Sequence, residues 1–302
     1  MRRWLSIAAA AAASVGDRPA TWLPGALAWL CTIGWIPLVV GVARVPTVSD
    51  LTFLGSRIFG SALWPWNLAL PALGLAAVVA TAFVLAAAAE SALLDELGGP
   101  RRGLRLTWPL LAIAAIAAIP AAAALLLLAV QLRDVAPIEF SAPDRGTGPV
   151  VRTLGRLLPF LVLFAVAAAA GSVLQAAAAR LVHDRAEDVR GALAGSARLL
   201  VSGGAPVLAQ LVASALGRLA TIVVGAVLLR VLWAPVGVLL AGGERGALTI
   251  GLLVGFVAIW LCLVLVAGAL HAWASAGWSL LLTGRLGEQG LDRRRQEASI
   301  DR

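Results

Sequence analysis

The sequence predicts an all-α fold, a polytopic membrane helix bundle of about six transmembrane helices with short amphipathic interfacial helices. Three observations predict this fold. Of the 302 residues, 61% are hydrophobic and only 13% are charged, whereas a soluble domain carries roughly 25% charged residues. The mean hydropathy is +0.93. Six apolar stretches also reach the length of roughly 20 residues that a helix needs to cross a bilayer.

The six predicted spans are separated by short segments with Pro, Gly and charged residues, as connections are. We expect the spans at residues 20–43, 66–89, 108–132, 153–180, 206–233 and 247–282. Residues 1–302 then form a single membrane domain, with an interfacial N-terminal helix over 1–18 and a cytoplasmic tail over 283–302. The last span would be about 54 Å long at 1.5 Å per residue. This exceeds the hydrocarbon thickness of about 30 Å, so part of it must tilt, kink or lie at an interface.

The distribution of arginines predicts the orientation of the chain in the membrane. All 24 cationic side chains are Arg, a preference typical of a GC-rich bacterial genome. With the N-terminus inside and residues 1–18 left out of the count, twelve Arg fall in cytoplasmic segments and eight in external ones. This bias favours the cell (inner or plasma) membrane with both termini cytoplasmic. A cleaved signal peptide over residues 1–18 is the alternative, and its removal would reverse every later loop. Because the Arg residues flank apolar spans, the net charge of +8 does not indicate nucleic-acid binding.

Two ionisable residues fall well inside predicted spans, Arg218 and His271. Such residues indicate function by default, because burying charge in a bilayer is costly. They are the candidate binding residues, forming a polar spot between spans five and six with Gln175, Gln210 or Ser275. The alternative is that both overlong spans slide, so that Arg218 snorkels to the interface and His271 lies at the cytoplasmic boundary. Glu90, just past the end of span two, is the nearest acidic partner for Arg218.

Other motifs carry less chemistry. His183 and Glu187 have a spacing that can hold a metal on a helix, but with a single His we interpret them as a solvated cytoplasmic helix face. Cys31 and Cys262 lie in apolar runs and are interpreted as small apolar residues. Gly251 and Gly255 form a GxxxG motif that favours helix packing inside the bundle. We therefore predict no catalytic constellation, no metal and no cofactor, and expect the protein not to be an enzyme.

Three lead-in segments precede pairs of spans and suggest three hairpins: Met1–Val15, Leu93–Leu106 and Val189–Val201. The stretches WLPGALAWLCTIGWIPLVVG and LAGSARLLVSGGAPVLAQL resemble six-helix bacterial membrane proteins of unknown function related to the membrane domain of glycerophosphodiester phosphodiesterases. The resemblance covers the overall layout. It implies no catalytic residues here, because those enzymes carry their catalysis in a separate soluble barrel.

Two non-catalytic functions are compatible with these features, and a third hypothesis is an intramembrane enzyme, which a carboxylate beside His271 would favour. The first is a non-catalytic scaffold or accessory subunit that works through packing against the lipid bilayer or a membrane protein partner. The alternative is a small transporter or export permease subunit, working with a separate ATPase, with the polar spot between spans five and six. A polar cavity around Arg218 would favour the second hypothesis.

Overall fold

A computed structural model describes residues 2–43, 53, 57, 60–63, 65–98, 100–141, 148–243 and 246–283. Every regular element in these residues is a helix, which confirms the all-α prediction. Six helical segments are long and apolar enough to cross a membrane, as in a multi-pass membrane protein: Pro19–Val42, Trp66–Glu96, Gly103–Ser141, Pro149–Arg185, Gly204–Ala241 and Ala247–Leu282. The predicted tail from residue 284 onward lies outside the described residues.

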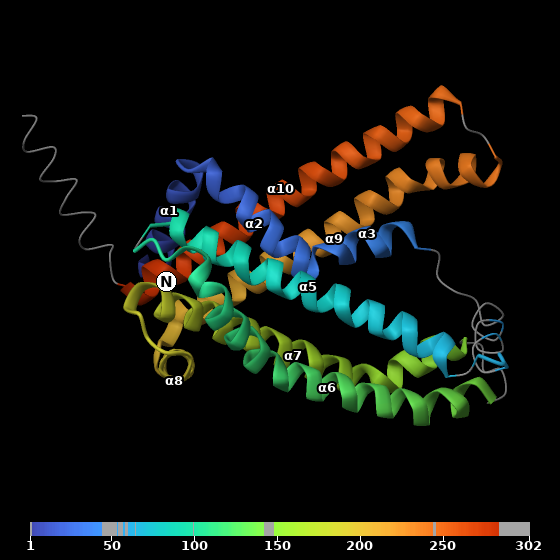
Figure 1. The fold of residues 1–302 in the computed structure, drawn as a ribbon, viewed down its shortest axis with the longest axis horizontal. Helices are drawn as coiled ribbons and strands as arrows, with labels where there is room; N and C mark the ends of the chain where they lie inside the picture. The colour runs from blue at the N-terminus through green and yellow to red at the C-terminus, as the bar shows by residue number, and fades with distance from the viewer. Residues whose placement is uncertain are drawn as a thin grey trace, which may run out of the picture. The chain divides into compact units, whose positions relative to one another are not determined.

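The helices follow one another along the chain (Figure 1). In order they are α1 (Arg2–Gly16), α2 (Trp22–Trp29), α3 (Trp35–Val42), α5 (Trp66–Glu96), α6 (Thr107–Ser141), α7 (Pro149–Arg185), α8 (Val189–Ser202), α9 (Gly204–Ala241) and α10 (Ala247–Thr283). Two 3₁₀ turns, Pro19–Thr21 and Gly103–Leu106, precede α2 and α6. A π-helical turn, Leu30–Gly34, joins α2 to α3.

Several helices are longer than the predicted spans. Helix α6 continues to Ser141 and α7 begins at Pro149, where hydropathy predicted a connection from 133 to 152. The reason is a pair of ion pairs between the two helices, beyond their apolar region. The Glu139 carboxylate is 2.8 Å from Nε of Arg152 and 2.7 Å from Nε of Arg156. These ion pairs hold the polar ends of the two helices together, so the helices continue past the residues that lipid would solvate.

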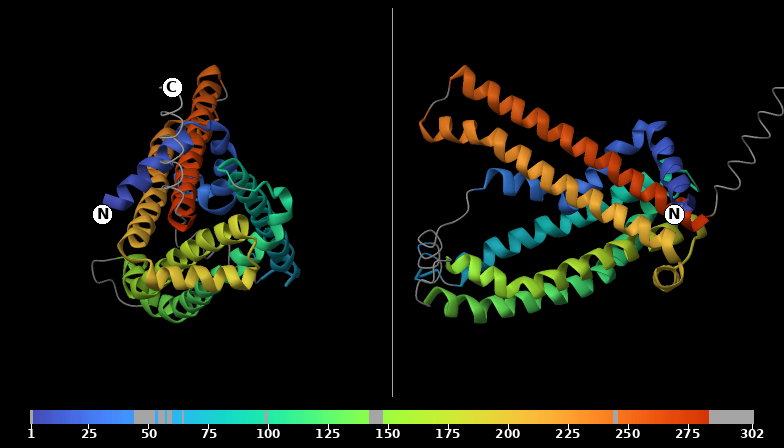
Figure 2. Two further views of the ribbon diagram at one scale, coloured as in Figure 1. Left: turned by 90° about the vertical axis from the view of Figure 1, so that its left-hand side faces the viewer. Right: turned by 180° about the vertical axis from the view of Figure 1, so that it is seen from behind.

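The chain divides into two compact units by its contacts, and each is described separately. Unit 1 contains residues 1–7, 108–211 and 278–302. Within it, α6 and α7 lie side by side (Figures 1 and 2), and a Cβ on Gly171 would collide with the carbonyl of Ala117. A small core of Val173, Val207 and Trp278 joins α7, α9 and α10 in this unit. Gln210 is also buried here and accepts a hydrogen bond from Trp4 Nε1 at 3.1 Å.

Unit 2 contains residues 8–107 and 212–277. Its core joins α2 to α10 through Ala26, Trp29, Val264 and Ala267. The two backbones touch where Gly25 meets Gly268, because a Cβ on either residue would collide with backbone atoms of the other helix. Glycine at both positions therefore permits this close crossing.

The GxxxG motif predicted to pack does not do so. A Cβ built on Gly251 or Gly255 would meet no atom within 4 Å. Close packing instead uses Gly25 and Gly268, which lie on different helices and form no sequence motif. The interpretation of Gly251 and Gly255 as a packing motif is wrong for the described residues, because the motif faces away from the neighbouring helices.

The three predicted lead-in segments differ in structure. Helix α1 buries Ile7, Ala11 and Val15, which are four residues apart and so form one face. Helix α8 begins with a cap in which the Asp188 carboxylate accepts a hydrogen bond from the backbone N–H of Gly191. The middle segment is not a separate helix, because residues 93–96 continue α5 and residues 103–106 form a 3₁₀ turn. The threefold pattern is therefore wrong at this position.

Candidate functional site

A polar cluster in unit 2 joins α5 to α10. The Nε2 atom of His271 lies 2.7 Å from Oε2 of Glu90, and the Ser275 hydroxyl donates to Oε1 of Glu90 at 3.2 Å. His271 and Ser275 are four residues apart on α10, a spacing that puts both side chains on one helix face. The side chains of His271 and Glu90 are only 16% and 17% exposed. One carboxylate thus receives donors from two successive turns of the opposing helix.

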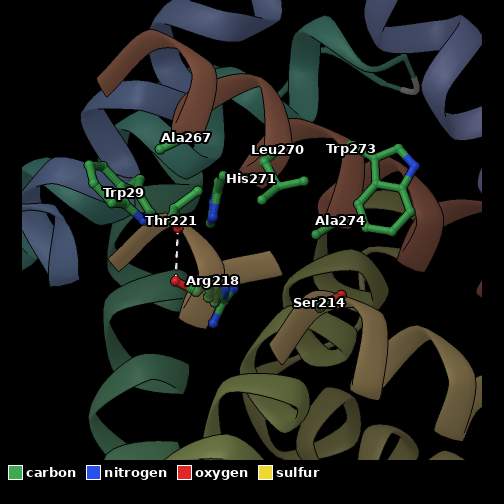
Figure 3. A pocket seen from close by; sticks show the side chains of 9 residues that line it. All are labelled: Trp29, Ser214, Arg218, Thr221, Ala267, Leu270, His271, Trp273 and Ala274. Atoms are coloured by element: carbon green, nitrogen blue, oxygen red, sulfur yellow. Dashed lines mark hydrogen bonds between the residues drawn. The ribbon is translucent and has the colours of Figure 1, made fainter. Parts of the chain in front are cut away.

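The structure brings together the two residues predicted from the sequence. Arg218 of α9 and His271 of α10 line the same small cavity (Figure 3), whose other walls come from α2, α9 and α10: Trp29, Ser214, Thr221, Ala267, Leu270, Trp273 and Ala274. Ser214, Arg218 and Thr221 lie at positions i, i+4 and i+7 of α9, so they share one face of the helix. The space open to a water-sized group is about 10 Å³, close to the least volume that holds one water molecule.

Some polar groups that line the cavity form hydrogen bonds within the protein, and others do not. The Thr221 hydroxyl donates to backbone carbonyls of its own helix, to Arg218 at 2.8 Å and Gly217 at 3.2 Å. The Trp273 indole N–H donates to the carbonyl of Ala8 at 3.0 Å. The buried Ser214 hydroxyl has no hydrogen-bond partner among the described residues. Arg218 interacts electrostatically with Glu90, so the cavity and the carboxylate belong to one charged site.

Of the companions predicted for Arg218 and His271, the structure brings Ser275 and the acidic residue Glu90 to the site. Gln175 and Gln210 belong to unit 1, and Gln210 there accepts its hydrogen bond from Trp4. Residue type does not distinguish Ser275 from the two glutamines in the sequence, because each is an uncharged polar residue in an apolar span. The sequence feature that could have predicted Ser275 as a companion of His271 is their spacing of four residues, which places both polar side chains on one face of an apolar helix.

The position of Glu90 differs from the prediction. Span two was expected to end at residue 89, with Glu90 at the boundary, but α5 continues seven residues past residue 89 to Glu96, about 10 Å at 1.5 Å per residue. The extension consists of Ala, Leu, Asp, Glu and Ser residues, among which Ala, Leu and Glu are good helix formers. Glu90 is therefore an intrahelical carboxylate that faces a neighbouring helix rather than a residue at the end of a helix.

Comparison of the chain with protein-family models, with curated proteins and with solved structures gave no match. The resemblance to membrane proteins related to glycerophosphodiester phosphodiesterases therefore stays a prediction. The function has to be argued from the site itself, from Glu90, His271, Ser275, Arg218 and the cavity that two of them line.

The cluster has the groups of a Ser–His–acid set but not its connectivity. In a catalytic triad the base contacts the hydroxyl, and the acid orients the base. Here the Ser275 hydroxyl bonds to the Glu90 carboxylate, and the His271 ring bonds to the other oxygen of the same carboxylate. The carboxylate thus connects the two groups, and the hydroxyl is held as a donor. This arrangement favours storing or passing a proton over activating a nucleophile.

The second predicted motif, His183 with Glu187, is not a solvated helix face. Helix α7 ends at Arg185, and Ala186 takes a left-handed conformation with φ of 56°, so His183 and Glu187 do not lie on one continuous helix. His183 is completely buried in unit 1, with its Nδ1 atom 2.7 Å from the Asp184 carboxylate. Within the described residues, no group of three or more His, Cys, Asp or Glu side chains forms a metal site.

Proposed function

We propose that the protein is a small membrane transport protein in which the Glu90–His271 pair is the proton-binding group. The observation that carries this proposal is the 2.7 Å contact between His271 Nε2 and the Glu90 carboxylate. Both residues lie within helices long and apolar enough to span a membrane. Carboxylate and histidine side chains inside such helices are the usual components of proton relays in pumps and transporters.

The free-energy cost of burying ionisable side chains at this site also favours a transport function over a scaffold function. Glu90, Arg218 and His271 come from three different spanning helices, α5, α9 and α10. Ionisable residues inside a bilayer are expensive, and a buried ion pair is often no more stabilising than apolar residues of similar volume. A protein that works only by packing against lipid or a partner gains nothing from such a cluster. A protein that must bind and release a proton requires it.

Histidine is suited to this role because its usual pKa, about 6.5, lies closest to neutral pH among the side chains. With Glu90 and Arg218 both charged, their charges cancel, and a proton on His271 changes the net charge of the site from zero to one. A change of this kind can bias two conformations of a helix bundle. The proposal includes the bacterial cell membrane as location, with both termini cytoplasmic, and an ATPase or another membrane protein as a partner.

The experiment is proton flux through the purified protein in liposomes. The vesicles contain a pH-sensitive dye, and a potassium gradient with an ionophore drives protons inward. We expect the protein to accelerate acidification of the lumen, and Glu90→Gln or His271→Gln to abolish this acceleration. Glu96→Gln is the matched control, because Glu96 is an exposed carboxylate on the same helix, α5. Flux that is absent in the native protein, or unchanged in both site variants, would contradict the proposal.

A further inference from the structure

The cavity beside the proton-binding pair contains donors that the protein itself does not use. Among the described residues, the guanidinium of Arg218 has no hydrogen-bond acceptor, and it interacts electrostatically with Glu90. The Ser214 hydroxyl, four residues earlier on the same face of α9, is 9% exposed and also lacks a partner. Both residues line the cavity (Figure 3). Buried polar groups are normally paired, so the unpaired Ser214 hydroxyl, with the half-buried Arg218 lining the same cavity, indicates an occupant that accepts hydrogen bonds.

The charge of the occupant follows from the groups around the cavity. The only ionisable side chains lining it are Arg218 and His271, and neither can be negative. Both oxygens of the nearby Glu90 carboxylate already accept hydrogen bonds, from His271 and Ser275. Arg218 and Ser214 thus line a cavity that has no carboxylate among its lining side chains. A guanidinium in this position favours a carboxylate or phosphate oxygen, which it can bind with two parallel hydrogen bonds.

His271 connects the occupant to the proton. Its Nε2 atom is committed to Glu90, and an ionised carboxylate only accepts, so Nε2 carries a hydrogen. The Nδ1 atom has no hydrogen-bond partner among the described residues. When Nδ1 takes up a proton it becomes a donor, and the site gains one positive charge. The charged groups facing the ring are then Arg218 of α9 and Glu90 of α5.

We infer that this cavity binds one oxygen of a small oxyanion, a carboxylate or a phosphate, held by Arg218 and Ser214 and coupled to protonation of His271. The inference rests on the proposed transport function and names the class of its substrate. The small volume fits a single oxygen atom, with the rest of the ligand outside the cavity. By linkage, a proton on His271 strengthens anion binding, and the bound anion strengthens proton binding by the same factor.

The test is anion binding by the full chain in nanodiscs of zwitterionic phosphatidylcholine, without any gradient. Sodium acetate is the probe, exchanged against sodium chloride at constant ionic strength, and thermal stabilisation gives the affinity because a ligand of the folded state raises the melting temperature. Measurements at about pH 6 and about pH 8 lie on either side of the usual histidine pKa. We expect saturable acetate binding that is tighter at the lower pH.

Three variants and one control locate the site. Arg218→Gln should weaken acetate binding about tenfold or more, since it removes charge-assisted hydrogen bonds. Arg218→Lys keeps the charge and should also weaken binding, since it loses the planar fork. Ser214→Ala should weaken binding about fivefold, as loss of one hydrogen bond does. Arg198→Gln, at an exposed Arg of α8, should leave acetate binding unchanged.

The outcomes separate the possible sources of the oxyanion. Inorganic phosphate that competes with acetate supports a free anion as the ligand. Stabilisation in phosphatidylglycerol nanodiscs that disappears in Arg218→Gln supports the same site with a lipid phosphate as the ligand. Absence of saturable binding in all of these conditions, or binding unaffected by the Arg218 and Ser214 variants, would overturn the inference. Because binding is measured without flux, a failure of proton transport would overturn only the proposed function.

Discussion

The Nε2 atom of His271 and the Oε2 atom of Glu90 lie 2.7 Å apart although 181 residues separate them in the chain. This contact connects the C-terminal half of α5 with the C-terminal half of α10. The side chains of both residues are less than one fifth exposed. Arg218 interacts electrostatically with Glu90. The pair therefore links α5 and α10 through two largely buried ionisable side chains.

The first prediction concerns the stability of this charged site. Glu90→Leu should destabilise the protein by about 3–5 kcal/mol, because it leaves His271 without its acceptor and Arg218 without the nearby negative charge in a desolvated site. The triple variant with Arg218→Leu and His271→Leu should recover most of that loss, because all the charge is then removed together. Thermal unfolding in detergent measures both variants. A triple variant less stable than the single one would show that the cluster stabilises the fold by itself.

Hydropathy and helix signals predict much of this fold from the sequence. The six apolar stretches, the first residue of two spans, Trp66 and Ala247, and the helical segments around residues 2–16 and 189–202 agree with the structure. The helix ends were less predictable. Hydropathy marks where lipid contact ends, whereas α5 and α6 continue until their polar contacts end, at Asp95, Glu96 and Glu139.

The site was predictable as a pair of residues but not as a set of contacts. The cost of charge in a bilayer singles out Arg218 and His271 from the sequence alone. Their neighbours depend on which helices adjoin, and uniform Ala- and Leu-rich spans carry little information about that. Glu90 was predicted as the acidic partner of Arg218, but its contact with His271 was not predicted, because α5 was expected to end at residue 89. The close contact of Gly25 with Gly268 was not predicted, because the two glycines belong to helices far apart in the sequence.

The second prediction concerns that glycine crossing. Gly268→Ala should destabilise the protein by about 1–3 kcal/mol, because overpacking at a tight contact forces the backbone to shift. The added Cβ would lie 2.6 Å from Cα of Ala26, and a backbone atom cannot rotate away. Gly255→Ala is the control, because a Cβ there meets no atom within 4 Å. It should be neutral or slightly stabilising, as Gly to Ala in an open helical position is. Equal effects of the two changes in thermal unfolding would contradict the assigned contact.

The third prediction concerns the ends of α6 and α7. Glu139→Gln should weaken the hairpin by about 1.5–3 kcal/mol, the range for hydrogen bonds to charged groups, because its carboxylate is 5% exposed and pairs with two arginines. Arg156→Gln should cost less than about 1 kcal/mol, because this side chain is 57% exposed and solvent screens its charge. Hydrogen exchange of residues 134–141 and 149–156 measures the loosening. Faster exchange confined to Arg156→Gln would reverse this ranking.

The fourth prediction concerns the orientation of the spans in the membrane. The Arg bias predicts cytoplasmic termini, and successive crossings then place the end of α6 outside and the end of α8 inside. We expect Ser141→Cys to react in intact cells with a membrane-impermeant maleimide and Ser202→Cys to react only after the cells are broken. Both are made in a background where Cys31 and Cys262, the free thiols within spans one and six, are replaced by Ala. The opposite pattern of labelling would show that the chain is inserted in reverse, as cleavage of residues 1–18 would require.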